Sequence, residues 1–84
     1  MTIICRTEEQ KNKFVTLIEE ELNRLENTKR KLIEQKKELI IDYESDKISK
    51  SEYERLMIIN FNREQTNEWL IKGNIENLQS IRVE

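Results

Sequence analysis

Few side chains in this sequence have types and spacings that could perform chemistry. Cys5 is the single cysteine and there is no histidine, so the chain cannot supply the three or four ligands of a zinc site. A cysteine–histidine nucleophilic pair is excluded for the same reason, and the lone Gly73 cannot form a glycine-rich phosphate loop. Asp42 and Glu44 are paired carboxylates, but they have no histidine or metal partner. We therefore expect no enzyme, no metal site and no cofactor within these residues.

Composition narrows the fold class. The chain has 84 residues, of which 38% are charged and 36% hydrophobic, with one glycine and no proline. Hairpin turns between strands depend on Gly, Pro and Asn-Gly pairs, so multi-stranded β folds are nearly excluded. The net charge of -2 and the abundance of Ile, Leu and Glu argue against disorder. These features predict an all-α protein made of long helices.

Two further sequence features bear on location and partners. A single thiol forms no disulfide framework, and no apolar run approaches the roughly 20 residues of a membrane span, so we expect a cytoplasmic protein without a membrane partner.

Basic runs at Lys29–Lys31 and Lys36–Lys37 wrap around a helix, because helical spacing spreads neighbours over different faces. We therefore expect no direct DNA contact, although nucleic-acid binding by this band is an alternative. Cys5 is either a buried small hydrophobe or part of a loose end.

The first long helix is predicted from about residue 7 to residue 44. This stretch contains neither glycine nor proline and is rich in Glu, Lys, Leu and Ile. Apolar residues recur in it at alternating spacings of three and four, which is the heptad pattern of a coiled coil. The predicted seam of the first helix consists of Val15, Ile18, Leu22, Leu25, Leu32 and Leu39 and ends at Tyr43. Lys29 and Lys36 interrupt it with polar positions.

A turn at residues 45–49 should separate this helix from a second one at about residues 50–82. Ser49 followed by Glu52 is a capping box, in which the serine side chain accepts from the backbone at the start of a helix. Ile48 before the cap and Tyr53 inside the helix form a hydrophobic staple. Gly73 predicts either a kink or an early end of the second helix, followed by a short final segment.

Folding the chain back at this turn gives an antiparallel two-helix coiled-coil hairpin, a single unit over residues 1–84. Positions whose numbers sum to about 96 then face each other, so Tyr43 meets Tyr53, while Lys36 faces Asn60 and Lys29 faces Asn67. Such polar layers fix register at some cost in stability. Leu32 opposite Glu64 fits poorly. The predicted seam of the second helix, apart from its polar layers, consists of Leu56, Ile71, Ile75 and Leu78.

Two helices cannot hide every apolar side chain in this sequence. Helical geometry directs several large residues near the turn away from the seam or onto its flank, and the outer face of the second helix also carries Ile59 and Trp69. An exposed apolar surface on a small helical protein marks a partner interface. The predicted interface consists of Ile40, Ile41, Tyr43, Ile48, Tyr53, Met57, Ile58 and Phe61. We expect self-association through it.

The segment from Leu39 to Leu56, LIIDYESDKISKSEYERL, resembles one found in large serine recombinases such as phage integrases. In that family a coiled-coil hairpin is often inserted in the zinc-ribbon domain. Its sequence pattern begins with a Leu/Ile-rich helix that is followed by a Tyr and a few polar residues. Ile-Ser, two further residues, Glu-Tyr/Phe and a Leu then follow in that order. The family often has Gly in the turn, where this chain has Asp46-Lys47. The resemblance extends over the hairpin, about residues 11–78.

This resemblance implies a role in site-specific DNA recombination. The family's hairpin projects from DNA-bound subunits, and its tip contacts the tip of a partner subunit during synapsis of the attachment sites. A recombination directionality factor redirects the coiled coil for the reverse reaction. The chain lacks the family's resolvase domain, serine nucleophile and zinc-binding cysteines, so the resemblance implies an excised motif. Residues 1–6 would then be either the edge of the excised segment or residual zinc-ribbon sequence, with Cys5 an orphaned ligand in the second case.

An alternative needs no recombinase. A free-standing small phage or bacterial protein that begins at Met1 could act as an adaptor or inhibitor and dock a helix face into a partner's groove. The lone tryptophan, Trp69, on the predicted outer face suits such a role.

Overall fold

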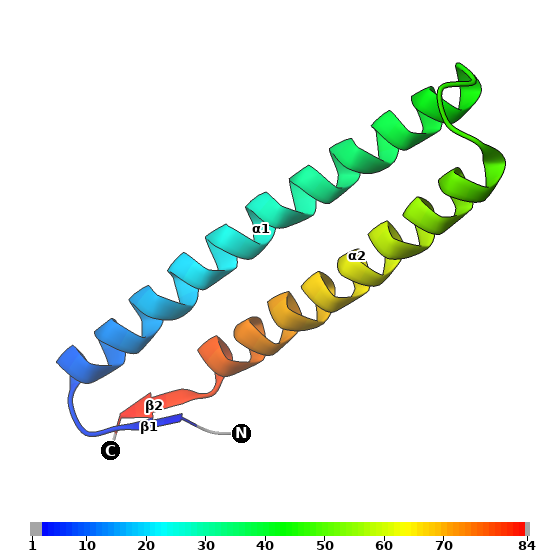
Figure 1. Cartoon of the computed structure of the whole chain (residues 1–84). Helices are drawn as coiled ribbons and strands as arrows, with labels where there is room; N and C mark the ends of the chain where they lie inside the picture. Colours follow the sequence, from blue (N-terminus) through cyan, green and yellow to red (C-terminus); the bar gives the residue numbers. More distant parts are fainter. Residues whose placement is uncertain (1–2, 84) are drawn as a thin grey trace.

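The computed structural model describes residues 3–83, which form a rod 60 Å long and 18 Å by 12 Å across. Its elements are strand β1 (Ile3–Cys5), helix α1 (Glu8–Glu44), helix α2 (Lys50–Gln79) and strand β2 (Ile81–Val83). The chain reverses after α1, and α2 returns along it, so the two short strands meet at the end opposite the turn (Figure 1). The predicted all-α helical hairpin is confirmed in these two helices.

Side-chain caps explain where both helices begin. Thr7 Oγ1 accepts a hydrogen bond from the Gln10 N–H at 3.1 Å, and Gln10 Oε1 accepts one from the Arg6 N–H at 2.9 Å. At the second helix, Ser49 Oγ accepts from the Glu52 N–H at 3.1 Å, as the capping box predicts. Each cap satisfies an N–H that has no partner inside its helix.

The turn between the helices is a Schellman motif. The Lys47 N–H donates to the Asp42 carbonyl at 2.8 Å, and the Asp46 N–H donates to the Tyr43 carbonyl at 3.1 Å. Asp46 has a φ of 59°, the left-handed conformation that glycine usually supplies at this position. Asp46 therefore takes a conformation that glycine adopts without steric cost.

We expect Asp46→Gly to stabilise the hairpin by about 0.5–1 kcal/mol, because glycine enters the left-handed region without a Cβ clash. Part of that gain is offset by the larger chain entropy of glycine in the unfolded state. Urea denaturation followed by circular dichroism measures the difference. Asp46→Ala is the matched control and should destabilise the protein, since it keeps the Cβ and loses the carboxylate. Equal shifts for both variants would mean that charge, and not backbone conformation, governs this position.

The core lies between the helices and is formed by one position of α1 that recurs every seven residues. Ile18, Leu25 and Leu32, spaced seven residues apart, are buried, with Leu25 only 2% exposed. Six of the remaining predicted seam positions are half-buried, namely Val15, Leu22, Leu39, Leu56, Ile71 and Leu78. This narrow core is what a pair of helices can bury without further layers.

The polar layers differ from the prediction. Asn60 Nδ2 donates to the Leu32 carbonyl and Asn67 Nδ2 to the Leu25 carbonyl, each at 3.0 Å. The expected partners Lys36 and Lys29 are half-buried and lie one turn further along α1. The pairing of Lys36 with Asn60 and Lys29 with Asn67 is therefore wrong. A lysine head group stays hydrated while its stem lies against the protein, so the asparagines bond to backbone carbonyls instead.

One predicted seam residue lies outside the seam. Ile75 is 42% exposed, whereas the neighbouring Asn74 is half-buried. Asn74 continues the seven-residue spacing of the buried Asn60 and Asn67, so the inward position in this turn falls on Asn74. Asn74 Nδ2 bonds within its own helix to the Leu70 carbonyl at 2.8 Å, and the series of cross-helix bonds ends there.

The end of α2 also differs from the prediction. The helix passes through Gly73 without a left-handed residue and ends at Gln79, where a helix to about residue 82 was expected. Ile81–Val83 instead pairs in parallel with Ile3–Cys5 in a two-stranded sheet that the composition did not predict. Ile3 N–H donates to the Ser80 carbonyl at 3.2 Å, and Cys5 is completely buried. β-Branched residues at both ends of the chain favour strands once the helices bring them together.

Candidate protein interface

The first element of the candidate interface is the pair of tyrosines at the turn. The rings of Tyr43 and Tyr53 are stacked, with centroids 4.4 Å apart and planes inclined by 16°. This contact confirms the predicted pairing of Tyr43 with Tyr53 across the hairpin. Aromatic pairs in this geometry contribute about 0.5–1.5 kcal/mol beyond area burial. Both tyrosines therefore serve mainly to close the hairpin, although Tyr43 remains 36% exposed.

The other predicted interface residues differ in accessibility. Ile41, Ile58 and Phe61 are each more than half exposed, at 57%, 62% and 56%. The half-buried members of the set are Ile40, Ile48, Tyr53 and Met57. Only the first three can give a large apolar contact area to a partner without rearrangement of the hairpin.

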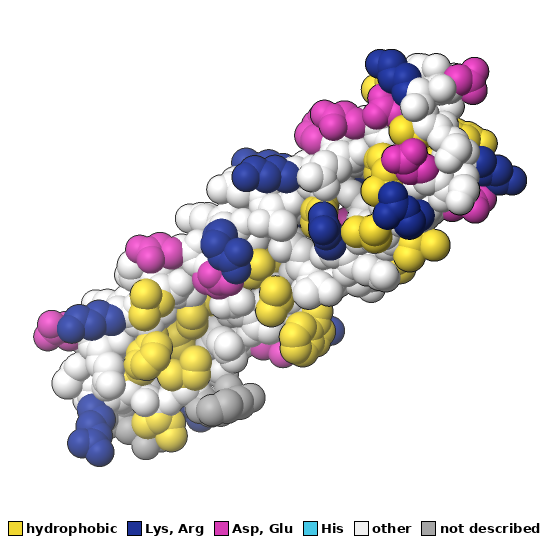
Figure 2. All heavy atoms as spheres, viewed as in Figure 1, with side chains coloured by type: hydrophobic (Ala, Val, Ile, Leu, Met, Phe, Trp, Pro, Cys, Tyr) yellow, Lys and Arg dark blue, Asp and Glu magenta, His cyan; other side chains and the backbone are white. Residues whose placement is uncertain are grey.

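The exposed residues near the turn do not form one patch. On helical spacing, Ile58 and Phe61 lie on one side of α2, while Ile41 points away from α2 on the outer side of α1. Figure 2 shows hydrophobic side chains at this end of the rod interspersed with basic and acidic ones. A partner at the turn would therefore meet separate apolar residues inside a charged surround.

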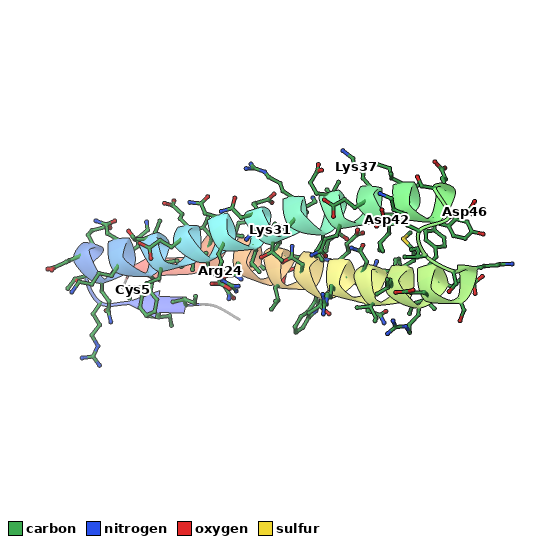
Figure 3. The ribbon with its side chains drawn as sticks, turned by 45° about the horizontal axis from the view of Figure 1, so that its top comes forward. Cys5, Arg24, Lys31, Lys37, Asp42 and Asp46 are labelled. Carbon is green, nitrogen blue, oxygen red and sulfur yellow. The ribbon has the colours of Figure 1, made fainter. Side chains whose placement is uncertain are left out.

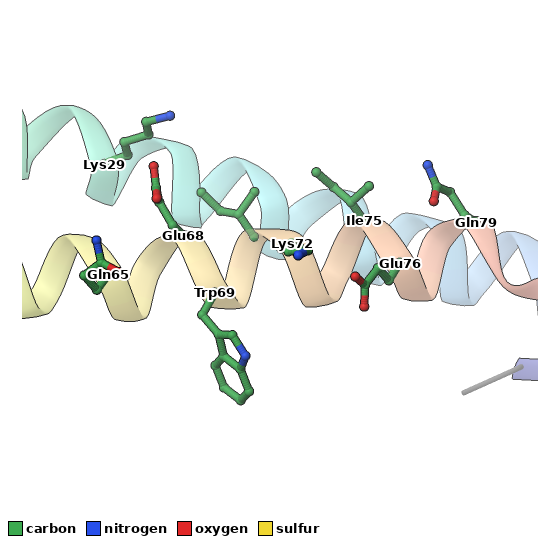
Figure 4. A pocket seen from close by; sticks show the side chains of 9 residues that line it. Lys29, Gln65, Glu68, Trp69, Lys72, Ile75, Glu76 and Gln79 are labelled. Atoms are coloured by element: carbon green, nitrogen blue, oxygen red, sulfur yellow. The ribbon is translucent and has the colours of Figure 1, made fainter.

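An exposed tryptophan lies on α2 toward the middle of the rod. Trp69 is 73% exposed and lines a groove with Gln65, Glu68 and Ile75, which Lys29 borders from α1. Figure 4 shows the Trp69 ring projecting away from α1, while Glu68 and Ile75 of α2 point to the side on which α1 lies and Lys29 projects from α1 itself. The sequence placed Trp69 on the outer face, but the predicted interface did not include it.

A third apolar surface lies at the end where the strands meet. Phe14 and Leu17 of α1 are 37% and 62% exposed, and Ile4 of β1 is 57% exposed. Hydrophobic side chains gather over this end in the space-filling view (Figure 2). Phe14 and Leu17 share a groove with Gln10 and Lys13. Phe14, Leu17 and Ile4 were not among the predicted interface residues, all of which lie near the turn.

Charged residues are distributed around the rod. The Arg24 guanidinium donates to the Glu21 carboxylate, with Nε 3.0 Å from Oε2, and this bond lowers the pKa of Glu21 and raises that of Arg24. The Nζ atom of Lys37 lies 3.6 Å from Oε1 of Glu34, and the Lys37 side chain projects from α1 into solvent (Figure 3). Arg24, Lys31 and Arg63 line a second groove, on the side of the hairpin away from Trp69. The Lys29–Lys37 band is thus divided between both flanks of α1 and solvent.

Two inward-facing groups bear on chemistry within the rod. Glu64 Oε1 is buried and, within the described residues, has no hydrogen-bond partner. The sequence indicated a poor fit for Glu64 opposite Leu32, but the Leu32 carbonyl bonds to Asn60, one turn before Glu64 on α2. The Cys5 thiol is free but fully buried in β1. Over residues 3–83 no group of three or more Cys, Asp or Glu side chains is arranged to hold a metal ion.

Neither helix, over the residues that the structure describes, has a stretch apolar enough to cross a membrane. In comparisons with known proteins, no family model, no curated protein and no solved structure matches this chain.

Proposed function

We propose that the hairpin is a protein–protein interaction module that associates with a second copy of itself through the apolar residues near its turn. The observation that supports this most directly is the exposure of Ile41, Ile58 and Phe61, each above half. Apolar side chains scattered singly are ordinary, but Ile58 and Phe61 are three residues apart on one side of α2 and form a joint apolar surface, to which Ile41 adds a separate exposed residue on α1. The Schellman motif and the serine cap hold the turn in one conformation, which lowers the entropic cost of binding.

The double variant Ile41→Lys/Ile58→Lys tests this function. Both side chains are exposed, so the substitutions should leave helicity unchanged while weakening self-association by about tenfold or more, because desolvated lysines replace apolar contacts. Sedimentation equilibrium measures the association and circular dichroism the helicity. Leu17→Lys is the matched control, since Leu17 is as exposed as Ile58 but lies at the opposite end of the rod. An unchanged dimer in the double variant would contradict a role for the turn.

The more specific proposal is that this module is the coiled-coil motif of a large serine recombinase in the cytoplasm of a host bacterium. Its support is the resemblance of the segment from Leu39 to Leu56; the turn departs from the family pattern in having Asp46-Lys47 where the family often has Gly. In that role the hairpin would join DNA-bound subunits during synapsis, with a directionality factor as a further partner and no direct DNA contact of its own. When the hairpin replaces its counterpart in an active serine integrase, Ile58→Lys should reduce integration much more than DNA binding.

One observation favours the second candidate function, a free-standing adaptor or inhibitor. Trp69, the most exposed large hydrophobic residue described, lies away from the turn and beside a groove. Tryptophan is enriched among the residues that dominate binding energy at interfaces. A partner captured through Trp69 but not through Ile41 or Ile58 would support the adaptor function over the recombinase module.

A further inference from the structure

Exposed side chains on α2 form a continuous stripe that extends from the turn to the middle of the rod. Ile58, Phe61, Gln65 and Trp69 follow one another at spacings of three, four and four residues, so they lie along one side of the helix. This stripe, residues 58, 61, 65 and 69, is centred about 150° around the helix from the buried Asn60 and Asn67, on the side of α2 nearly opposite the seam. The hairpin's own packing therefore leaves it free, and the Trp69 ring points outward from it (Figure 4).

The stripe is large enough for a stable contact. Its apolar members are 62%, 56% and 73% exposed for Ile58, Phe61 and Trp69 respectively. With aromatic side chains of about 150–250 Å² each, the three together offer on the order of 400 Å² of apolar surface. A stable interface buries about 800 Å² per partner, and somewhat more than half of that area is apolar. The stripe thus supplies most of the apolar area that one side of such an interface needs.

The order of residues in the stripe is self-complementary. Phe61 and Trp69 lie four residues before and four residues after Gln65. If a second α2 runs antiparallel with Gln65 opposite Gln65, each Trp69 meets the Phe61 of the other copy. A two-fold axis brings the same patch of both copies together, so both aromatic pairs form at once.

Charges at the two ends of the stripe give one attraction and one repulsion in this arrangement. In this register Lys72 comes within one turn of Glu54 on the other copy, which is favourable, whereas Glu76 comes directly opposite Glu54, a like-charge pair that has Arg55 beside it. These four side chains are exposed, so they would lie at the rim, where opposite charges guide register. Lys72 also falls opposite Ile58, which its aliphatic stem can cover.

We infer that the occupant of this stripe is a second copy of the same chain, held in an antiparallel α2–α2 dimer with its two-fold axis at Gln65 and two reciprocal Trp69–Phe61 contacts. The inference rests on that part of the proposed function by which the hairpin associates with itself. In this arrangement the main contact between the two copies lies on the side of α2 and not at the turn.

A cysteine at the axis tests this arrangement. In Gln65→Cys the two introduced thiols of a dimer face each other, and mild oxidation should give a disulfide-linked dimer on a non-reducing gel. Thr66→Cys is the control, because Thr66 is the next residue, is also exposed and points to the other flank of α2. The native chain provides a background control, since the fully buried Cys5 should not cross-link. Equal cross-linking through positions 65 and 66 would overturn the inference.

Trp69 provides a second readout, because it is the single tryptophan in the chain. Its fluorescence should shift to shorter wavelength as protein concentration rises, and Phe61→Lys should move the midpoint of that shift to about tenfold or higher concentration. Leu17→Lys should leave the midpoint unchanged. If the chain dimerises in the centrifuge while Trp69 emission stays constant and Gln65→Cys does not cross-link, this inference fails and contact at the turn stands. Failure of contact at the turn is separate: it appears as a dimer that Ile41→Lys alone leaves intact, because Ile41 lies on α1 outside the stripe, while Trp69→Lys weakens that dimer.

Discussion

Leu25→Ala should destabilise the hairpin by about 3 kcal/mol, a substantial part of its whole stability. Leu25 is 2% exposed in the middle of the seam, and its carbonyl accepts the side-chain hydrogen bond from Asn67. Removing its methyl groups leaves a cavity between two long helices, which cannot close without shifting the asparagine layer. Urea denaturation monitored by circular dichroism measures the loss.

Leu17→Ala provides the matched control for this substitution. It removes the same atoms from the same helix, with the same change in helix propensity, but from a side chain that is 62% exposed. We expect a change of about 0.5 kcal/mol or less. Similar losses for Leu17→Ala and Leu25→Ala would contradict a core confined to the seam.

The double variant Asn60→Leu/Asn67→Leu should be more stable than the native chain, by about 1–2 kcal/mol per site. Leucine has nearly the branched shape of asparagine, and these two positions are 4% and 5% exposed, so the new side chains are buried. Loss of the hydrogen bonds from Asn67 and Asn60 costs the Leu25 and Leu32 carbonyls little stability, because each carbonyl still accepts its own hydrogen bond within α1. Denaturation measures the gain, with the exposed Asn62→Leu as a control that should change stability by about 0.5 kcal/mol or less.

That gain should be accompanied by a loss of specificity. The cross-helix bonds from Asn60 and Asn67 allow one register, whereas leucine at the same positions tolerates several registers and larger assemblies. Size-exclusion chromatography should show a broader distribution of species for the double variant than for the native chain. A less stable double variant that keeps a single sharp peak would show that the asparagines support stability, not register.

Much of the fold could be predicted from local patterns. The absence of proline, the apolar spacing of three and four, and the Ser49–Glu52 capping box located both helices and the turn between them. The stacking of Tyr43 on Tyr53 followed from folding the chain back at that turn. These features depend on neighbouring residues or on one simple fold-back, so the sequence contains what is needed to predict them.

Other features depended on contacts that the pattern does not contain. Asn67 and Asn60 bond to the Leu25 and Leu32 carbonyls. Every residue has a backbone carbonyl, so the sequence does not indicate which of them accepts a side-chain hydrogen bond. The spacing of Asn60, Asn67 and Asn74 by seven residues was the available signal that the seam follows Asn74 and not Ile75. Strands Ile3–Cys5 and Ile81–Val83 form only because the helices bring the two ends together.

The candidate interface was predicted in part. Ile41, Ile58 and Phe61 are exposed as expected, but Tyr43 and Tyr53 are largely engaged with each other, and Trp69 extends the apolar surface along α2. Helical spacing identifies which side chains leave the seam. It does not show which of them neighbouring side chains cover, and that requires coordinates.

Sedimentation equilibrium of the intact chain over a range of concentrations, from micromolar to millimolar, tests the central claim most directly. The exposed apolar residues near the turn and along α2 predict a monomer–dimer equilibrium in which the apparent mass rises from 10.2 kDa toward twice that value. A mass that stays at 10.2 kDa throughout this range would contradict self-association.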